Sequence, residues 1–334
     1  MKTRIAYLDI AKFIGIFSIY LGHYHVYAGF AYPFVFTFHV ALFFFLSGCS
    51  ERLSKPLSPG KYIIRNIRTL LVPYCLFAVM SIAFNAIRFD TYTKLVPDLL
   101  LVAKGCAREQ FYAGSLWFFT CLFVVRLLFY FLKRWVKCLW GVVLICAGLC
   151  VTARCLLQSR LPFNIDSAFQ YILAYAFGYL CFPVVQKWFS WDRDIKRASC
   201  LMAAAITSLC AVMVFFGKDF LMARLEGTRL EYIYVIARTG ILILWVLVIS
   251  RCVEQSPLME KLGRDTLYLC GSEYIVKETF QTSLPMIGLQ FDLPNPWTAY
   301  LCAFAMLMLC WYTLVPVEKK LLACLQHKPA SNQT

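Results

Sequence analysis

The chain has 334 residues, of which 61% are hydrophobic, and its mean hydropathy is +0.67. Because soluble domains are only about half apolar, this composition excludes an ordinary soluble domain and indicates a membrane protein with several spans. The formal net charge is +15, but the basic residues flank apolar segments and do not gather on one polar face, which excludes a nucleic-acid-binding protein.

The sequence predicts an all-α, polytopic transmembrane helix bundle of about ten helices. The segments predicted to lie inside hold roughly twice as many lysines and arginines as the outer loops, which predicts that both termini are cytoplasmic. We expect an integral-membrane domain over residues 1–317 and a polar, disordered C-terminal tail over 318–334. The predicted spans are 10–30, 33–50, 69–88, 114–132, 138–157, 168–186, 199–217, 232–250, 266–284 and 296–315.

The first predicted helix carries a polar stripe. Lys12 and His23 are eleven positions apart, which is three turns plus about 20°, so they share a face about 16 Å apart along the axis. Asp9 lies on the same side, whereas His25 points away. A histidine inside the membrane is more often a packed core residue than a catalyst, although it can exchange a proton near neutral pH. The shared face favours a catalytic role for His23.

The second predicted helix begins at Pro33, after a linker of about two residues, and is expected to run antiparallel to the first. His39 then lies at a depth similar to that of His23, so both side chains can line one cavity. Ser47 and Gly48 close this helix, where glycine permits a close approach of the backbone. A metal site needs a further ligand at that depth, and the stripe offers none, so we expect no metal.

A basic segment precedes the third span. Lys61, Arg65 and Arg68 recur at i, i+4 and i+7 and so lie on one side of a helix. The first interpretation is ordinary anchoring by positive charges on the cytoplasmic side. The second is a phosphate site, because arginine binds phosphate with two donors and nucleotide-bearing substrates are found in the cytosol. The pattern alone favours neither.

Three further residues stand out along the rest of the chain. Trp117, at the start of the fourth span, is most simply an aromatic residue at the membrane interface. Arg238 lies within the eighth span, where an unpaired arginine costs about 3 kcal/mol. Glu273 in the ninth span is its plausible partner, but Glu273 can equally pair with Lys277 on its own helix. The 16 cysteines are expected to be small packing residues.

Five motifs spread over most of the chain occur in a familiar order and spacing. They are Arg4-x4-Asp9-x2-Lys12-x10-His23, FFFLSG at 43–48, RNIRTLLVP at 65–73, LWF at 116–118 and LGRDTLYL at 262–269. Together they resemble the motifs of the bacterial integral-membrane acyltransferase-3 family, which includes O-acetyltransferases of surface polysaccharides, lipopolysaccharide and small sugars. FHVALFFFLSG at 38–48 is most similar to the branch of sugar and fucose O-acetylases.

The resemblance implies transfer of an acetyl or similar short acyl group from acyl-CoA to a hydroxyl of a carbohydrate or cell-surface glycan. It also implies a location in the bacterial plasma membrane, with acetyl-CoA or another acyl-CoA as donor substrate and no permanently bound cofactor. His23 is expected to act as general base or as a transient acyl carrier, and His39 to orient the acceptor or to stabilise the oxyanion. The expected acyl-CoA-binding residues are Lys12, Arg65, Arg68, Ser47 and Gly48, and the supporting residues are Asp9, Trp117, Arg238 and Glu273.

The chain departs from the family pattern at two places. Where members generally carry a late histidine, it has Ser272 and Glu273, and many members have arginine at the position of Lys12. A transporter or flippase of a polar glycan-related solute is the competing interpretation, although no pair of broken helices recurs in two halves. An enzyme that acylates an amine is a third.

Overall fold

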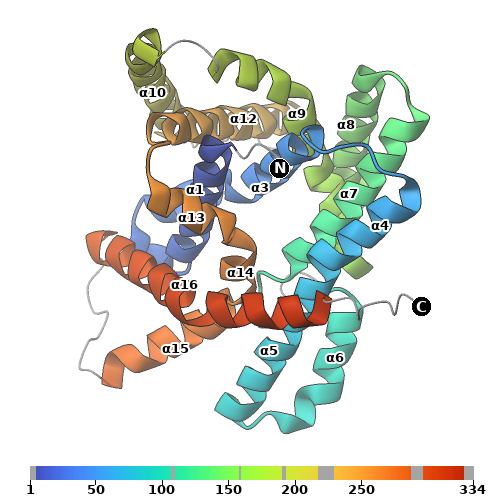
Figure 1. Ribbon diagram of the computed structural model, residues 1–334, viewed down its shortest axis with the longest axis vertical. Coiled ribbons are helices and arrows are strands. Elements are labelled where there is room, and N and C mark those ends of the chain that lie inside the picture. The colour runs from blue at the N-terminus through green and yellow to red at the C-terminus, as the bar shows by residue number, and fades with distance from the viewer. Residues whose placement is uncertain are drawn as a thin grey trace, which may run out of the picture. The chain divides into compact units, whose positions relative to one another are not determined.

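The computed structural model describes residues 5–106, 110–157, 159–189, 193–216, 229–286 and 296–326. Over these residues the chain is helical and contains no strand, which confirms the predicted all-α class (Figure 1). The chain divides into two compact units, each assembled from three stretches of sequence. The first unit comprises Met1–Arg52, Gly178–Thr266 and Asp292–Phe304, and the second comprises Leu53–Phe177, Leu267–Phe291 and Ala305–Thr334.

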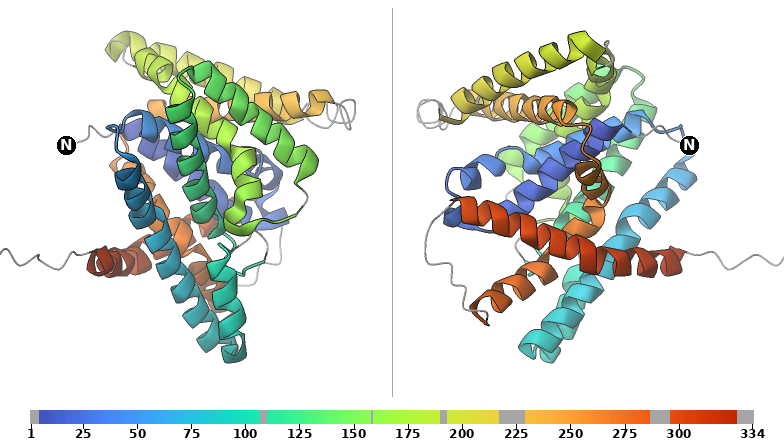
Figure 2. Two further views of the ribbon diagram at one scale, coloured as in Figure 1. Left: turned by 90° about the vertical axis from the view of Figure 1, so that its right-hand side faces the viewer. Right: turned by 60° about the vertical axis from the view of Figure 1, so that its left-hand side comes forward.

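The first unit is built around α1 (Ala6–Gly22), most of which is buried. Packed against it are α3 (His39–Arg52), α12 (Arg229–Cys252) and α13 (Pro257–Arg264), and α10 (Arg193–Phe216) packs on α12 (Figure 1, Figure 2). Gly15 lets α3 approach α1 closely, because a Cβ atom there would lie 2.7 Å from the Cζ atom of Phe43. Small residues at such crossings are common between membrane helices.

The connection between α1 and α3 is longer than the sequence predicts. It contains the short helices η1 (His25–Ala28) and α2 (Ala31–Val35). The first helix ends at Gly22 because the chain leaves helical geometry, with φ of +47° at His25 and +56° at Gly29. The expectation that His23 lies within a helix running to residue 30 is therefore wrong, and His23 is the C-cap of α1.

The second unit contains most of the remaining helices. They are α4 (Pro59–Asn66), η2 (Ile67–Leu71), α5 (Val72–Phe89), η3 (Tyr92–Lys94), α6 (Leu95–Ala103), α7 (Trp117–Trp135), α8 (Leu139–Leu156), η4 (Pro162–Asn164), α14 (Thr266–Gly271) and α15 (Glu273–Met286). The chain continues from α4 into α5 as one helix, with η2 as a π-helical segment between them. α9 (Ile165–Phe189) and α16 (Pro296–Gln326) contribute a part to each unit.

Among the residues that the structure describes, five helical segments are long and apolar enough to cross a membrane, by length and composition. They are Ala31–Arg52, Pro59–Phe89, Pro162–Phe189, Leu230–Cys252 and Pro296–Gln326. Large apolar side chains such as Ile87, Leu144 and Val184 are more than two-thirds exposed, as lipid-facing residues are in the absence of lipid. These helices support a membrane protein, whereas the count of about ten spans stays a prediction.

Two boundaries differ from those predicted. The ninth span, expected as one helix over 266–284, is interrupted at Ser272 between α14 and α15. The last helix continues to Gln326, so the predicted start of a disordered tail at residue 318 falls inside α16. The remainder of that tail, 327–334, lies outside the described residues.

Candidate functional site

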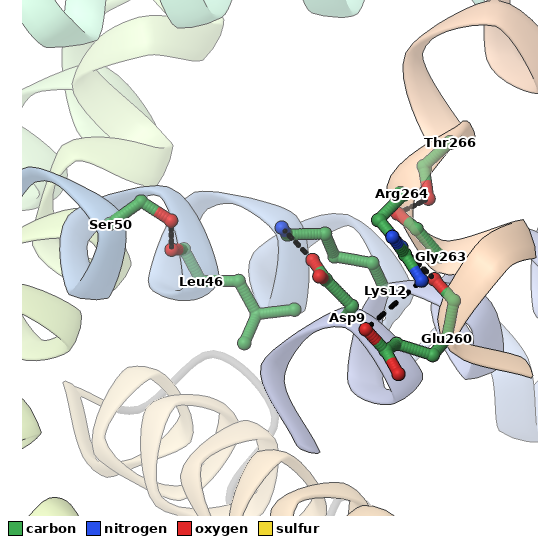
Figure 3. A network of polar contacts seen from close by, with 8 residues as sticks. All are labelled: Asp9, Lys12, Leu46, Ser50, Glu260, Gly263, Arg264 and Thr266. Atoms are coloured by element: carbon green, nitrogen blue, oxygen red, sulfur yellow. Dashed lines mark hydrogen bonds and ion pairs between the residues drawn. The ribbon is translucent and has the colours of Figure 1, made fainter. Parts of the chain in front are cut away.

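Asp9 and Lys12 form an ion pair on α1 (Figure 3). The Nζ atom of Lys12 lies 2.7 Å from the Oδ1 atom of Asp9, on the face that the helical period predicts. Asp9 is only 4% exposed, whereas the Lys12 side chain is 29% exposed. The Oδ2 atom of Asp9 has no hydrogen-bond partner among the described residues. The charge of this buried carboxylate is therefore balanced by Lys12.

The LGRDT part of the late motif lies against this pair. A Cβ atom added at Gly263 would overlap the main-chain carbonyl of Asp9, so α13 and α1 touch backbone to backbone. Beside this contact the Nη2 atom of Arg264 lies 3.1 Å from the Oε1 atom of Glu260, and the Thr266 hydroxyl donates to the Gly263 carbonyl at 2.7 Å (Figure 3). Two motifs that are more than 250 positions apart in the sequence thus form one polar site.

The other side of the site is α3. Figure 3 shows the Lys12 ammonium group pointing away from α13 and toward α3, where the Ser50 hydroxyl donates to the Leu46 carbonyl at 2.9 Å. Ser47 and Gly48 are buried on this helix, which continues to Arg52 and does not close at Gly48 as predicted. The first and second motifs are therefore neighbours in the fold.

His39 is held in one tautomer. Its Nδ1 atom lies 2.6 Å from the carbonyl oxygen of Val35, an atom that can only accept a hydrogen bond, so Nδ1 carries the proton. In the neutral ring the Nε2 atom is then an acceptor and can take a proton. His39 is 7% exposed, and the Phe36 ring stands edge-on to it with 5.2 Å between ring centroids. The ring is oriented before any substrate binds.

His23 lies in the same region of the first unit. Its neighbour Gly22 faces the Phe36 ring, which is the ring that packs on His39, because a Cβ atom at Gly22 would lie 3.1 Å from Cε2 of Phe36. His23 is partly exposed and its Nε2 atom is buried. His25 is instead exposed and bonds to the Tyr32 hydroxyl at 3.1 Å. The helical period that predicts a separation of His23 from His25 does not apply here, because both residues follow the end of α1 at Gly22.

The basic segment of the second unit lies where the helix widens into η2. The Arg65 guanidinium stands 4.8 Å from the centre of the Tyr62 ring, and Arg68 is exposed. Asn66 accepts a hydrogen bond from Nη1 of Arg126 on α7 at 3.3 Å, so a third arginine approaches the segment that holds Arg65 and Arg68. Single-turn π-helical segments often occur at functional sites.

The three remaining predicted residues have different surroundings. Trp117 is 7% exposed and packs beside Tyr171, 5.9 Å between ring centroids, so it is a core residue of its unit and not an exposed interfacial one. The Arg238 guanidinium lies 5.7 Å from the centre of the Tyr234 ring. Glu273 is buried at the start of α15. The pairing of Arg238 with Glu273 stays a prediction.

One comparison with known proteins is decisive. The model of the acyltransferase-3 family, described as an acyltransferase domain, matches residues 5–315. The chain belongs to the acyltransferase-3 family. No curated protein matches the chain, and no solved structure does. The matched region contains all eleven residues predicted for the site of this acyltransferase.

In the first unit of the acyltransferase Asp9 pairs with Lys12, Lys12 points toward α3 (Figure 3), and the Phe36 ring packs on His39 and faces Gly22, the residue before His23. Sequence reasoning missed Glu260 and Arg264, although their spacing of four positions at the edge of the LGRDTLYL motif indicates an ion pair on a helix. Within the described residues no cluster of histidine, cysteine and acidic side chains has the geometry of a metal site.

Replacing Lys12 by methionine should lower the free energy of unfolding by about 1–3 kcal/mol, because the buried Asp9 carboxylate loses its cation. The double variant Lys12→Met/Asp9→Asn should recover most of this loss, because the amide carries no charge. Thermal unfolding in detergent measures both. Lys277→Met is the matched control, because the Lys277 ammonium group lies 3.5 Å from the Glu278 carboxylate and both side chains are about one-quarter exposed. The free energy of unfolding should fall by less than about 0.5 kcal/mol in this variant. Equal losses for Lys12→Met and Lys277→Met would contradict the role given to the buried pair.

Proposed function

We propose that this acyltransferase moves an acetyl or similar short acyl group from acyl-CoA to a hydroxyl of a carbohydrate or cell-surface glycan. The observation that carries the proposal is the family match over residues 5–315. The buried, single-tautomer His39 supports it, because an oriented imidazole can exchange a proton with a hydroxyl or a developing oxyanion. No observation on the described residues favours a transporter.

In the proposed reaction the hydroxyl oxygen attacks the thioester carbonyl carbon, the carbon–oxygen bond forms and the carbon–sulfur bond breaks. A sugar hydroxyl is a weak acid and needs a base at the moment of attack, which is the role proposed for His23. The hydroxyl proton leaves through the base to the CoA thiolate. In the alternative route His23 carries the acyl group between donor and acceptor. His39 orients the acceptor by accepting a hydrogen bond at Nε2, or, as the imidazolium, donates from Nε2 to the oxyanion.

We assign the phosphates of acyl-CoA to Arg65 and Arg68, with Lys12, Ser47 and Gly48 as further donor-binding residues. This assignment follows from charge, since guanidinium forks suit phosphate oxygens. It accompanies the proposed topology of about ten spans with both termini cytoplasmic, in a bacterial plasma membrane. Acyl-CoA is a substrate in this scheme, and no permanently bound cofactor is required.

Acetyl-CoA should stabilise the purified protein by about 2.7 kcal/mol when it is present at about 100 times its Kd. Arg65→Ala/Arg68→Ala should lose most of this gain, because two phosphate ligands are removed. The double variant Arg88→Ala/Lys94→Ala is the matched control, since it removes two exposed cations that lie at and beyond the other end of the same helix. A thermal shift measured with acetyl-CoA and with CoA tests this. An unchanged gain in Arg65→Ala/Arg68→Ala would contradict the phosphate assignment.

The reaction itself is tested on its product. Labelled acetyl-CoA is incubated with the enzyme and a bacterial glycan, and the product is treated with mild base, which cleaves an ester but not an amide. A base-labile label on the glycan is expected. A base-stable label would favour an amine acceptor, and no transfer to any glycan would contradict the carbohydrate assignment.

A further inference from the structure

A buried carboxylic acid group lies in the second unit, outside the polar site described above. Ser272 marks the bend between α14 and α15, and Glu318 lies on α16, which runs past this bend (Figure 1). The Ser272 hydroxyl donates a hydrogen bond to the Oε1 atom of Glu318. Both residues are 0% exposed. The Oε2 atom of Glu318 has no hydrogen-bond partner among the described residues.

Glu318 occupies an apolar position of α16. It continues the buried stripe formed by Val315 and Leu322, which are 1% and 4% exposed. The ammonium group of the next residue, Lys319, lies 5.5 Å from the centre of the Tyr268 ring. Among the described residues the Ser272 hydroxyl donates to Oε1 of this carboxyl, and Oε2 has no hydrogen-bond partner. Ionisable residues in such positions of membrane proteins are costly and are usually functional.

The neutral form of Glu318 fits these surroundings. A carboxylate buried with one neutral hydrogen-bond donor is strongly unfavourable because it loses its hydration, whereas a carboxylic acid avoids that cost. Oε1 then accepts from Ser272, and Oε2 carries a proton that has no acceptor in the described residues. A buried donor of this kind calls for an acceptor from outside the chain. A carbonyl oxygen, which accepts and cannot donate, suits it.

The same helix also reaches the basic segment. The Gln326 side-chain amide donates to the main-chain carbonyl of Arg68 at 2.9 Å. Gln326 and Glu318 are about 12 Å apart along α16, from the helical rise. An extended pantetheine arm spans such a distance, so one acyl-CoA can place its phosphates at Arg68 and a carbonyl at Glu318.

We propose that Glu318, held by Ser272 as a neutral carboxylic acid, donates a hydrogen bond through Oε2 to the thioester carbonyl oxygen of acyl-CoA. This inference rests on acyl-CoA being the donor, and does not depend on the acceptor. When the hydroxyl attacks and the carbon–sulfur bond breaks, the carbonyl oxygen carries transient negative charge, and the hydrogen bond from Glu318 strengthens. Glu318 keeps its proton throughout, and the hydroxyl proton goes to the thiolate.

The test uses the full-length protein in detergent and three variants. Glu318→Gln keeps the shape and a donor but cannot be a carboxylic acid, Glu318→Leu removes the donor, and Glu278→Gln is a control on the neighbouring helix α15. Infrared spectra should show a protonated carboxylic acid band that is present in the wild type and Glu278→Gln but missing in Glu318→Gln. With acetyl-CoA labelled at the thioester carbon, the carbonyl band should shift to lower frequency on binding to the wild type and to a smaller extent on binding to Glu318→Leu.

The activity of the same variants gives an independent reading. Glu318→Leu should lower kcat by about 10²-fold, the usual effect of losing one oxyanion donor, and Glu318→Gln should lower it less, because its amide still donates. The inference would be overturned, and the proposed function left standing, if the wild type showed no carboxylic acid band. The same holds if the thioester carbonyl band had the same frequency in the wild type and in Glu318→Leu while acetyl-CoA still stabilised both proteins. Transfer to an acceptor other than a carbohydrate would overturn the proposed function and leave this inference standing.

Discussion

Replacing His23 by alanine should lower kcat for acyl transfer by about 10²-fold or more, which is the scale of lost acid–base catalysis. His23 ends α1, and Gly22 next to it faces the Phe36 ring that packs on His39. The imidazole is therefore placed by the packing of the first unit and not by a mobile tail. The KM for acetyl-CoA should change little, because the donor is assigned to arginines elsewhere in the chain.

His25→Ala is the matched control, because His25 is exposed and bonded to Tyr32, and its kcat should stay within about twofold of the wild-type value. A His23→Ala enzyme with near wild-type activity would contradict the role of His23.

A further experiment separates the two routes proposed for His23. The wild-type enzyme is incubated with labelled acetyl-CoA in the absence of an acceptor, and the reaction is then quenched. A labelled acetyl group on His23 would indicate that His23 is an acyl carrier, and an unlabelled His23 would indicate that it is a general base.

His39 provides a second variant of the same experiment. His39→Ala removes both ring nitrogens, whereas His39→Asn keeps a donor that can reach the Val35 carbonyl and removes the Nε2 atom. Both should lose about 10²-fold in kcat, and His39→Asn should be the more stable of the two. Full activity in His39→Asn would mean that His39 acts only through its bond to Val35.

The local features of the site could be predicted from the sequence, because they depend on the helical period alone. Asp9 and Lys12 are three positions apart, and their ion pair follows from that spacing. The helical period places such a pair on one face only within a helix. It does not predict where a helix ends, and α1 stops at Gly22 because the residues that follow take positive φ values. The prediction that His23 lies within a longer helix was wrong for this reason.

Contacts between distant segments could not be predicted in the same way. The sequence contains both the first-helix motif and LGRDTLYL, but nothing in either indicates that Gly263 touches Asp9. Glu318 was likewise missed, because a glutamate before two lysines at the end of a span resembles a solvated helix end. Its apolar neighbours Val315 and Leu322, at helical spacing, were the available signal.

Replacing Gly263 by alanine should destabilise the protein more than any surface substitution, by about 1–3 kcal/mol, the range for overpacked sites. The added methyl group would overlap the carbonyl oxygen and carbon atoms of Asp9, and these are backbone atoms of a buried helix that cannot rotate away. α13 must therefore shift from α1, which disturbs the Asp9–Lys12 pair. Activity should fall together with the melting temperature.

Gly240→Ala is the matched control for Gly263→Ala, because Gly240 belongs to the same unit, lies within α12 and has no atom within 4 Å of an added Cβ. Alanine favours a helix over glycine by about 1 kcal/mol, so Gly240→Ala should raise the melting temperature or leave it unchanged. If the melting temperature falls in Gly263→Ala but not in Gly240→Ala, then backbone contact, and not helix propensity, decides the result at Gly263. If Gly263→Ala melts at or above the wild-type temperature, α13 does not pack on Asp9, and the polar site formed by the two motifs is wrong.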